Sequence, residues 1–449
     1  MATATAWRNW SGTVTARPAR VARPSSVEEL AETVRRATGE GRRVKAVGSG
    51  HSFTGIAVTD GVLLRMDALD APVRVDTRTG LVTVESGMPL HRLNAVLAAH
   101  GLAMTNLGDI DRQTVSGAIS TGTHGTGARS GGLAAQVRAL ELVLADGSSL
   151  RCSADEEPEV FAAARVGLGA LGIIARVTLQ CEPAFTLRAA EGPMRLAEVL
   201  GGLDELLAEN EHFEFYWFPH TDRTLTKRNN RLSPGERPRP LSRSRAWLDD
   251  EFLSNTAFEA VCRLGTAVPR AIPRLNALSG RALTARVYSQ DSHRVFVSPR
   301  RVVFREMEYA VPRESVADVV GAVHRWVAES GERVAFPVEV RFAPADDVWL
   351  STAHRRETAY VAVHQYHRLP YERYFRAVAA IADAVGGRPH WGKLHWLDAA
   401  ALRARYPRFD DFLAVRDRLD PTGALANPYL DRVLGPSAAP PRPAPPFTP

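Results

Sequence analysis

The segment 47–53 combines a sharp turn with side chains that can take part in chemistry. It reads Val-Gly-Ser-Gly-His-Ser-Phe and follows an apolar, strand-like run at 43–47. Two glycines one residue apart let the backbone turn sharply, and such a loop can direct several N–H groups at a phosphate or pyrophosphate. It lacks the Lys-Ser/Thr pair of a P-loop and the third glycine of a dinucleotide fingerprint. A tight turn that exposes His51 is the plainer interpretation of this segment taken alone.

A second segment, residues 104–132, is rich in glycine and in hydroxyl side chains. It contains Gln-Thr-Val-Ser-Gly-Ala at 113–118 and Thr-Gly-Thr-His-Gly-Thr-Gly at 121–127. The segment is too apolar and too ordered in pattern for a linker. A bare backbone with hydroxyls at intervals is typical of a segment that wraps a long polar ligand at close range. This second segment favours a ligand-binding role for the His51 loop over a plain turn.

Residues 167–172 match the pattern G-x-G-x-x-G, but their context is wrong for a nicotinamide site. A helix is expected before the glycines and a strand at 173–179 after them. The dinucleotide fingerprint needs a strand first, a helix second and a distal acid. We therefore reject nicotinamide binding, while a close approach of this backbone to another ligand stays open.

Glu339 and Arg341 form a charged pair nearer the C-terminus. They alternate with apolar residues in the run 337–342, so period two places the acid and the base on one face of a strand. An ion pair on a solvent-facing strand is the alternative interpretation of this pattern.

The run 388–396 holds two tryptophans, two histidines and a lysine around a glycine. This mixture is too unusual for a plain turn. A metal bound by His390 and His395 would lack a third ligand at suitable spacing, so we expect no metal. The remaining candidate for chemistry in this run is Lys393.

Composition excludes several classes of function. The 449 residues carry a net charge of +6, and the pI is about 9.5. No helix-turn-helix, finger or RNP-like pattern accompanies the basic residues, so we expect a solvated basic face and no nucleic-acid partner. No run approaches 18 apolar residues and no signal-peptide pattern opens the chain, so we expect no transmembrane segment. Cys152, Cys181 and Cys262 are too few and too scattered for a disulfide framework or a zinc site, which favours the cytoplasm.

Hydrophobic periodicity predicts short helices and strands in α+β order, without the regular spacing of βαβ units. Helices are expected at 25–39, 89–100, 157–165, 316–331 and 371–385. Strands are expected at 44–47, 62–66, 81–85, 173–179, 213–218, 302–309, 336–342 and 360–366, with a hairpin-like pair over 137–150. Residues 233–300 are expected to be irregular with weak helical stretches. The tail 436–449 is rich in Pro and Ala and is expected to be disordered.

Six motifs, taken in order, resemble those of the FAD-linked oxidoreductases of the vanillyl-alcohol-oxidase type. They are Gly-Ser-Gly-His-Ser-Phe (48–53), Gln-Thr-Val-Ser-Gly-Ala (113–118), Thr-Gly-Thr-His-Gly-Thr-Gly (121–127), Gly-Ala-Leu-Gly-Ile (169–173), Glu-Val-Arg (339–341) and His-Trp-Gly-Lys (390–393). Within that type the chain is most similar to the aldonolactone group, the L-gulono-1,4-lactone and D-arabinono-1,4-lactone oxidases or dehydrogenases, with alditol oxidases nearby. The resemblance runs from about residue 7 to about residue 435.

The resemblance implies an α+β fold with a two-part FAD-binding domain and a mixed-sheet substrate domain that covers the isoalloxazine ring. We expect the FAD-binding domain at 1–182 and the substrate, or cap, domain at 183–395. A C-terminal segment at 396–435 is expected to return to the FAD-binding domain, and the Pro-rich tail 436–449 follows it.

The resemblance also implies FAD as the cofactor, bound covalently by His51 through an 8α-histidyl bond. The 48–53 loop, the 108–127 segment and the turn at 173–174 are expected to contact pyrophosphate, ribose and adenine, so the match at 167–172 becomes a turn on the adenine side. The expected cofactor-binding residues are Val47, Gly48, Ser49, Gly50, His51, Ser52, Phe53, Gly108, Asp109, Gln113, Thr114, Gly117, Ser120, Thr121, Gly122, Thr123, His124, Gly125, Gly169, Ile173, Ile174 and His390.

The implied reaction moves a hydride from a CH–OH group of a small sugar lactone to flavin N5 while the hydroxyl loses a proton. Glu339, Arg341 and Lys393 are the expected catalytic residues. Arg341 and Lys393 are candidates for the cation near flavin N1, worth roughly 3–4 kcal/mol in the transition state. Glu339 can orient Arg341 and accept from a substrate hydroxyl, and either Glu339 or Lys393 can serve as the base. A charged substrate is not required.

Electrons are expected to pass to O₂ or to another acceptor. Gly108 lies where relatives carry a residue beside the flavin, and its missing Cβ would leave a path for oxygen to the C4a region. Oxidation of an open-chain alditol is the alternative to lactone oxidation. A flavin-free protein that binds sugar or nucleic acid would leave His51 and the 104–132 segment unexplained.

Overall fold

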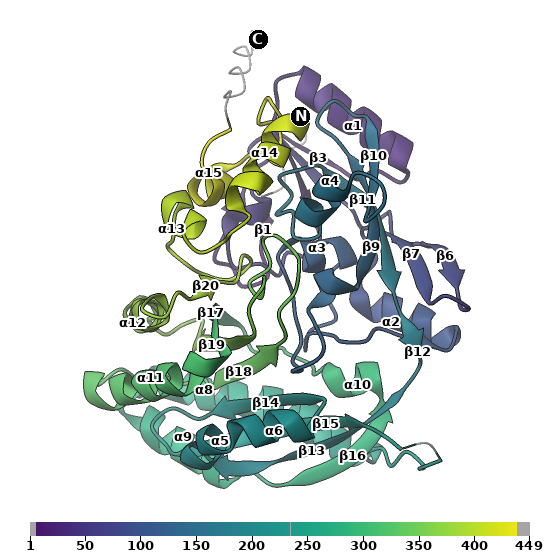
Figure 1. The fold of residues 1–449 in the computed structure, drawn as a ribbon. Helices are drawn as coiled ribbons and strands as arrows, with labels where there is room; N and C mark the ends of the chain where they lie inside the picture. Colours follow the sequence, from purple (N-terminus) through teal and green to yellow (C-terminus); the bar gives the residue numbers. More distant parts are fainter. Residues whose placement is uncertain (1–5, 234, 438–449) are drawn as a thin grey trace.

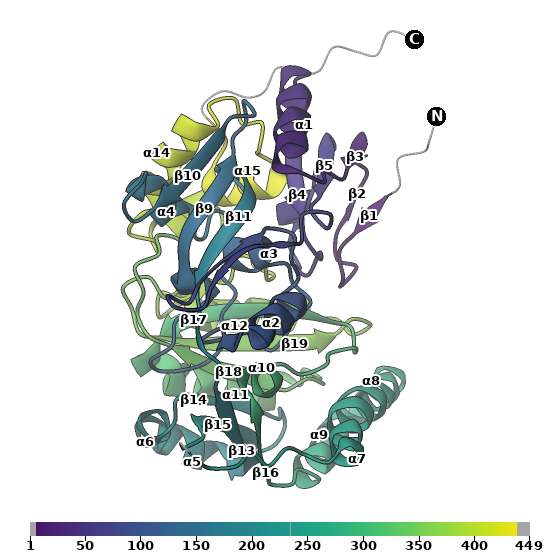
Figure 2. The ribbon, with the colours of Figure 1, turned by 90° about the vertical axis from the view of Figure 1, so that its right-hand side faces the viewer.

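The computed structural model describes residues 6–233 and 235–437, which form two regions built on different sheets (Figures 1 and 2). One region holds a three-stranded and a five-stranded sheet, together with the C-terminal helices. The other is built on one eight-stranded sheet. Two short pairs, β1 (Trp7–Arg8) with β2 (Thr15–Ala16) and β8 (Leu102–Ala103) with β12 (Glu182–Pro183), lie outside these sheets.

The three-stranded parallel sheet positions the loop that carries His51. Its order is β3 (Arg20–Ala22), β5 (Val62–Arg65), β4 (Val44–Val47), so the loop begins where β4 ends. The helix α1 (Val27–Gly39) packs on it with a buried apolar stripe. Its first turn is capped by Ser26, whose Oγ accepts from the N–H of Glu29 at 3.1 Å.

The five-stranded antiparallel sheet forms the rest of the N-terminal region. Its order is β10 (Ser149–Ser153), β9 (Val137–Val143), β11 (Ile173–Gln180), β7 (Leu81–Glu85), β6 (Pro72–Asp76). Three further helices accompany it: α2 (Leu90–Ala99), α3 (Val115–Ser120) and α4 (Pro158–Ala164). The short helix α3 lies within the glycine-rich segment and is capped by Thr114, whose Oγ1 accepts from the N–H of Gly117. Because β11 follows the glycines of 167–172, the strand and helix order contradicts a nicotinamide fingerprint, as expected.

The eight-stranded sheet has one apolar and one polar face. Its order is β16 (Arg286–Asp291), β13 (Thr186–Arg195), β15 (Arg223–Arg231), β14 (His212–Trp217), β18 (Val338–Ala343), β19 (Thr358–Tyr366), β17 (Phe304–Pro312), β20 (Arg388–Pro389). Helices α5 (Leu196–Gly201), α6 (Leu203–Glu209), α11 (Val316–Ser330) and α12 (Glu372–Asp383) cover the apolar face and share one core with it. Alternation along the central strands then sends Glu214, Glu306, Glu339 and Arg341 to the opposite face.

Residues 233–300 are more regular than the sequence analysis expected. A continuous helical run extends through α7 (Arg243–Ala246), a π-helical stretch (Trp247–Ala257) and α8 (Phe258–Ala267). It is followed by α9 (Ile272–Arg281), β16 and α10 (Ser292–Phe296), and Figure 2 shows α7, α8 and α9 together beside the large sheet. The expected helical stretches are present but are more extensive than expected. In 247–257, π-helical hydrogen bonds change the period, so apolar residues do not recur at the spacing of an α-helix.

The C-terminal helices return to the N-terminal region, where Figure 1 shows them in yellow beside α4. They are α13 (Ala399–Arg403), α14 (Phe409–Leu419) and α15 (Pro428–Leu434). Asn427 caps α15, and its Nδ2 lies 2.9–3.0 Å from the carbonyl oxygens of Gly55, Ile56 and Val58. Most of the tail expected to be disordered, 438–449, lies outside the described residues. Among the described residues, no helix is both long and apolar enough to cross a bilayer.

Candidate active site

Two adjoining cavities share the lining residues His51, Ser52, Gln113 and Thr121; the first lies within the N-terminal region, and the second lies between that region and the large sheet. The first, of about 1040 Å³, extends from the 48–52 loop to the turn at 167–174. The second, of about 740 Å³, lies over the polar face of the large sheet. A long ligand in the first cavity can therefore present one end to a small molecule in the second.

The 48–52 loop offers an anion-binding surface to the first cavity. Gly50 has a φ of 70°, and a Cβ on Gly48 would lie 2.2 Å from Thr114 Oγ1, so both positions require glycine. In the described part of the chain, the backbone N–H groups of 48–52 have no protein acceptor. Free N–H groups in a turn suit a pyrophosphate. The cavity therefore fits the FAD that the sequence implies.

The far end of the first cavity is closed by the turn that mimics a dinucleotide fingerprint. Gly169 has a φ of 65°, and Ile173 and Ile174 follow it along the wall. The sequence analysis missed Lys45, whose Nζ donates to Gly169 O at 2.8 Å and to Leu425 O at 3.1 Å. Burial lowers the pKa of Lys45 to about 7, against the opposing charge of Asp420. No motif singled it out, because its importance comes from long-range contacts.

Most of the expected cofactor-binding residues line one of the two cavities. The first is lined by Val47, Gly48, Ser49, Gly50, His51, Ser52, Gln113, Thr114, Gly117, Ser120, Thr121, Gly169, Ile173 and Ile174. The second is lined by Phe53, Gly108, Asp109, Thr123, His124 and His390, together with all three expected catalytic residues.

Gly122 and Gly125 line neither of these cavities. Gly122 follows the end of α3 with a φ of 77°, a conformation that favours glycine. A Cβ on Gly125 would lie 2.2 Å from the carbonyl oxygen of Leu107. These two glycines are therefore explained by backbone conformation and packing.

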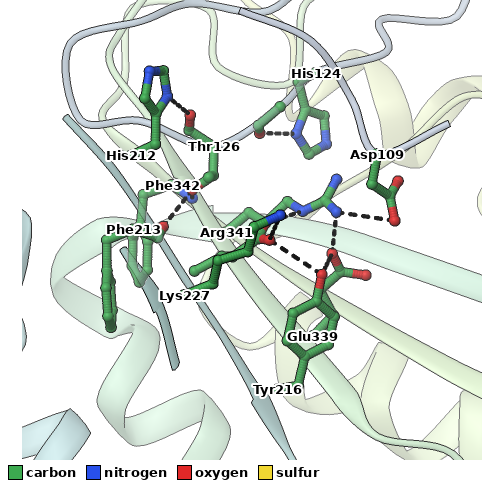
Figure 3. A network of polar contacts seen from close by, with 12 residues as sticks. Asp109, His124, Thr126, His212, Phe213, Tyr216, Lys227, Glu339, Arg341 and Phe342 are labelled. Carbon is green, nitrogen blue, oxygen red and sulfur yellow. Dashed lines mark hydrogen bonds and ion pairs between the residues drawn. The ribbon is translucent and has the colours of Figure 1, made fainter. Parts of the chain in front are cut away.

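Arg341 is enclosed by carboxylates on the polar face of the sheet (Figure 3). Its Nε lies 2.9 Å from Glu214 Oε2, its Nη2 lies 3.3 Å from Asp109 Oδ2, and it also contacts Glu339 directly. Glu339 and Arg341 are only 4% and 6% exposed. The solvent-facing alternative for this pair is therefore wrong, because the N-terminal region covers this face.

The charges of this cluster shift one another. Burial raises the pKa of Glu339, and the carboxylates of Asp109 and Glu214 add to this effect while Arg341 opposes it. Burial opposes the charge of Arg341, but the carboxylates of Glu339, Asp109 and Glu214 raise its pKa well above the ordinary value. Arg341 is therefore a permanent cation, whereas Glu339 is the acid of the pair that is poised to change its protonation.

Lys393 lies between two carboxylates that the sequence analysis did not single out. Its Nζ is 2.6 Å from Glu306 Oε1 and 2.8 Å from Glu308 Oε2. Burial works against its charge, but Glu306 and Glu308 raise the pKa of Lys393 above its ordinary value. Lys393 is therefore held as an ammonium and is unsuited to the role of base.

Two histidines adjoin this lysine. His124 contacts Glu308 Oε1 through Nε2 at 2.9 Å and stacks on Tyr360, with ring centroids 3.5 Å apart. His390 accepts from the N–H of Gly392 through Nδ1, and burial, with the Lys393 charge, lowers its pKa to about 3. His124, Glu308 and His390 lie close enough to share a metal ion. Glu308 is already bonded to His124 and Lys393, which explains the cluster without a metal, and His395 bonds Tyr429 instead.

Several charged residues of the second cavity escaped the sequence analysis. Glu306 and Glu308 alternate with apolar residues along β17, the same signal that identified Glu339 and Arg341, so the pattern was available. Glu214 carries the same signal on β14. Arg300, which contacts Asp109 and lies 3.9 Å from Glu339, belongs to an irregular segment where periodicity gives no signal.

The fold and the two cavities define a FAD-dependent oxidoreductase of the vanillyl-alcohol-oxidase type. A solved solvent-stable cholesterol oxidase superposes with a TM-score of 0.81 at 19% identity, covering 96% of this chain and 97% of that chain. The FAD binding domain family matches residues 18–153. The similarity to the cholesterol oxidase is a similarity of fold.

The D-arabinono-1,4-lactone oxidase family matches residues 177–433. An L-gulono-1,4-lactone dehydrogenase of Mycobacterium tuberculosis is 45% identical over 96% of this chain and 99% of its own length. An alditol oxidase of a Streptomyces species is 34% identical over 96% of this chain and 99% of its own length. The chain belongs to the D-arabinono-1,4-lactone oxidase family.

Proposed function

We propose that this protein oxidises an aldono-1,4-lactone, of the L-gulono or D-arabinono kind, at a CH–OH group. The observation that carries the proposal is the second cavity, whose wall of fixed charges meets the first cavity at His51. FAD, when bound in the first cavity, supplies the hydride acceptor. The family match and the L-gulono-1,4-lactone dehydrogenase relative support a lactone as the substrate.

The residues of the second cavity have different roles in this reaction. Arg341 and Lys393 hold permanent positive charge in fixed positions, so negative charge that develops beside them needs little reorganisation. Glu339 accepts the proton of the reacting hydroxyl, because its raised pKa brings it nearer the operating pH. Paired opposite charges line the cavity, which suits a neutral, hydroxyl-rich substrate.

We further propose that His51 binds FAD covalently. His51 lines both cavities, so it lies at the junction where the reactive ring of the cofactor is required. Burial, with the charge of Arg112, lowers the pKa of His51. A neutral imidazole at neutral pH is the form that can act as a nucleophile.

The proposal extends to the organisation and setting of the protein. FAD would be held by 1–182 with the returning segment 396–435, and substrate by 183–395. The described cysteines are free and buried, which supports a reducing compartment such as the cytoplasm. Electrons would pass to O₂ or to another acceptor.

Anaerobic titration tests the main proposal. Purified protein is mixed with a panel of aldonolactones and alditols, and bleaching of the flavin absorbance is followed. Bleaching by a 1,4-lactone is the expected result. Rapid bleaching by an open-chain alditol alone would instead favour alditol oxidation, the alternative that the Streptomyces relative supports, and no bleaching by either class would contradict both.

A further inference from the structure

His364, on β19, lines the second cavity and has no role so far in the proposed reaction. Its side chain is buried, and it projects from the polar face of the sheet between β17 and β18. The rings of Phe304 and Phe336 flank it, with centroids 5.2 and 6.2 Å away. The surroundings of its ring are therefore protein groups, with little contact to water.

Both ring nitrogens of His364 face hydrogen-bond acceptors. Nδ1 lies 3.2 Å from the carbonyl oxygen of Pro337, and Nε2 lies 3.2 Å from Glu306 Oε1. A carbonyl cannot donate, and Glu306 is ionised because the charge of Lys393, against the effect of burial, is the main cause that lowers its pKa, to about 2. A ring with a proton on each nitrogen, an imidazolium, would meet both acceptors.

His367, just beyond the end of the same strand, shows the opposite arrangement. Its Nδ1 lies 3.0 Å from the carbonyl oxygen of Val303, while its Nε2 accepts from Arg368 Nε at 3.2 Å. One acceptor and one donor are satisfied by a neutral ring. The contrast lies in the neighbours of the two rings: two acceptors face His364, whereas one acceptor and one donor face His367.

His364 lies beside the proposed base. Nε2 of His364 is 3.9 Å from Glu339 Oε2. The other groups that face Glu339 are Arg341 on its own strand, Glu214 and Tyr216 on β14, and Asp109 and Arg300 from irregular segments. Within the part of the chain that the structure describes, Glu306 and Glu339 are the charged groups within 4.0 Å of the His364 ring nitrogens.

We propose that His364 is a positioning residue, held as an imidazolium between Glu306 and Glu339, whose charge keeps Glu339 ionised and ready to take the substrate proton. The reacting hydroxyl gives its proton to Glu339, and FAD, when bound, would supply the acceptor for the hydride of the adjacent C–H, so that a C=O bond forms. His364 keeps its own proton throughout. The inference rests on the proposed function, to which it adds a residue outside the recognised motifs.

Nitrogen NMR of protein labelled with ¹⁵N-histidine tests the protonation state without turnover. His364→Gln identifies the signal by its loss, and His367→Gln serves as the matched control. At pH 7.5 we expect the imidazolium shift for His364 and the neutral shift for His367. A neutral His364 ring would overturn the proposal, whatever substrate the enzyme uses.

The effect on Glu339 is measured separately. Infrared difference spectra against Glu339→Gln follow the protonation of Glu339 directly, and stopped-flow reduction by lactone gives the acidic limb of the rate profile. In His364→Gln, the titration of Glu339 and the acidic limb of the rate profile should each move to higher pH by about one unit. This is the scale for losing one opposite charge at this distance. His364→Lys should return them toward the wild-type pH, and His367→Gln should leave them unchanged.

These outcomes separate the two proposals. An unmoved Glu339 titration in His364→Gln would overturn the positioning role. If no lactone or alditol reduces the flavin, the proposed function fails, while the NMR and infrared results still decide whether His364 sets the charge of Glu339. A uniform loss of rate without a shift in pH would indicate a purely structural side chain and would also overturn the proposal.

Discussion

His51 is the residue that distinguishes a covalent from a dissociable cofactor. Acid-precipitated wild-type protein is expected to stay yellow and to fluoresce in a denaturing gel. His51→Ala should still bind FAD through the 48–52 loop but should release it on denaturation. A colourless wild-type pellet with all FAD in the supernatant would show that the bond is absent.

The cations of the second cavity are expected to act on rate more than on affinity. Arg341→Met or Lys393→Met should lower the anaerobic flavin-reduction rate by roughly 100-fold or more, because interactions that strengthen in the transition state appear in kcat. Lys393→Arg should restore the flavin-reduction rate only in part, since a planar guanidinium does not replace a compact ammonium between Glu306 and Glu308. Stopped-flow reduction at saturating lactone is the measurement.

A matched control is needed, because removing a buried cation also destabilises the fold by about 3–5 kcal/mol. Lys227 lies 3.7 Å from Glu214 and does not line the second cavity. Lys227→Met should therefore share the fall in thermal stability while keeping most of the reduction rate. Equal loss of rate in Lys227→Met and Lys393→Met would remove the special role of Lys393.

At the scale of elements, alternation along the strands of the large sheet builds the site. Alternate apolar residues of β14, β17, β18 and β19 enter the core shared with the covering helices. The residues between them meet the N-terminal region and supply the acids and bases of the second cavity. A shift of one residue in the register of any of these strands would exchange the two faces.

The glycine-rich segment is the element that faces these strands, and Gly108 tests its role toward oxygen. A Cβ at Gly108 would lie 3.2 Å from the carbonyl oxygen of His124, so the backbone at one of these two residues must shift slightly. We expect Gly108→Ala to lower peroxide formation by O₂ several-fold while reduction of an artificial dye acceptor stays near wild type.

The control for this prediction is Gly39→Ala, at the end of α1, where an added Cβ meets nothing within 4 Å. It should leave both half-reactions unchanged. Equal effects of Gly108→Ala on oxygen and on the dye would show that the Cβ disturbs the site generally and that Gly108 does not control oxygen access.

At the scale of the whole molecule, the C-terminal helices hold the cofactor side together. Asn427 links α15 to the segment that follows the His51 loop. Asn427→Ala should lower the free energy of unfolding by about 2 kcal/mol or more, because it removes a helix cap and leaves the buried carbonyl oxygen of Ile56 without its donor. Denaturant unfolding and the flavin content of purified protein are the measurements.

Asp398→Ala provides the comparison, because Asp398 caps α13 through the N–H of Ala401 at an exposed position. Asp398→Ala should lower the free energy of unfolding by about 1 kcal/mol, the value of one helix cap, and the variant should keep its flavin. Equal stability losses in the two variants would show that the contacts of Asn427 with residues 55–58 contribute nothing beyond the cap.

The sequence by itself determined the class of the protein and the location of much of its site. Six short motifs indicated the FAD-dependent family, and period two placed Glu339 and Arg341 on one strand face. These features are local: a turn that needs glycine, or a strand with two faces, can be recognised from neighbouring residues. The same signal on β17 held Glu306 and Glu308, although only their tertiary partner, Lys393, made them recognisable.

The tertiary structure decided which charges are buried together and what state each one takes. Arg300, Lys45 and His364 have no local pattern, and Lys393 was a possible base until Glu306 and Glu308 were seen to enclose it. The reason is physical. Ionisation depends on burial and on charges a few ångströms away, and in this protein those charges come from strands and loops far apart in the chain.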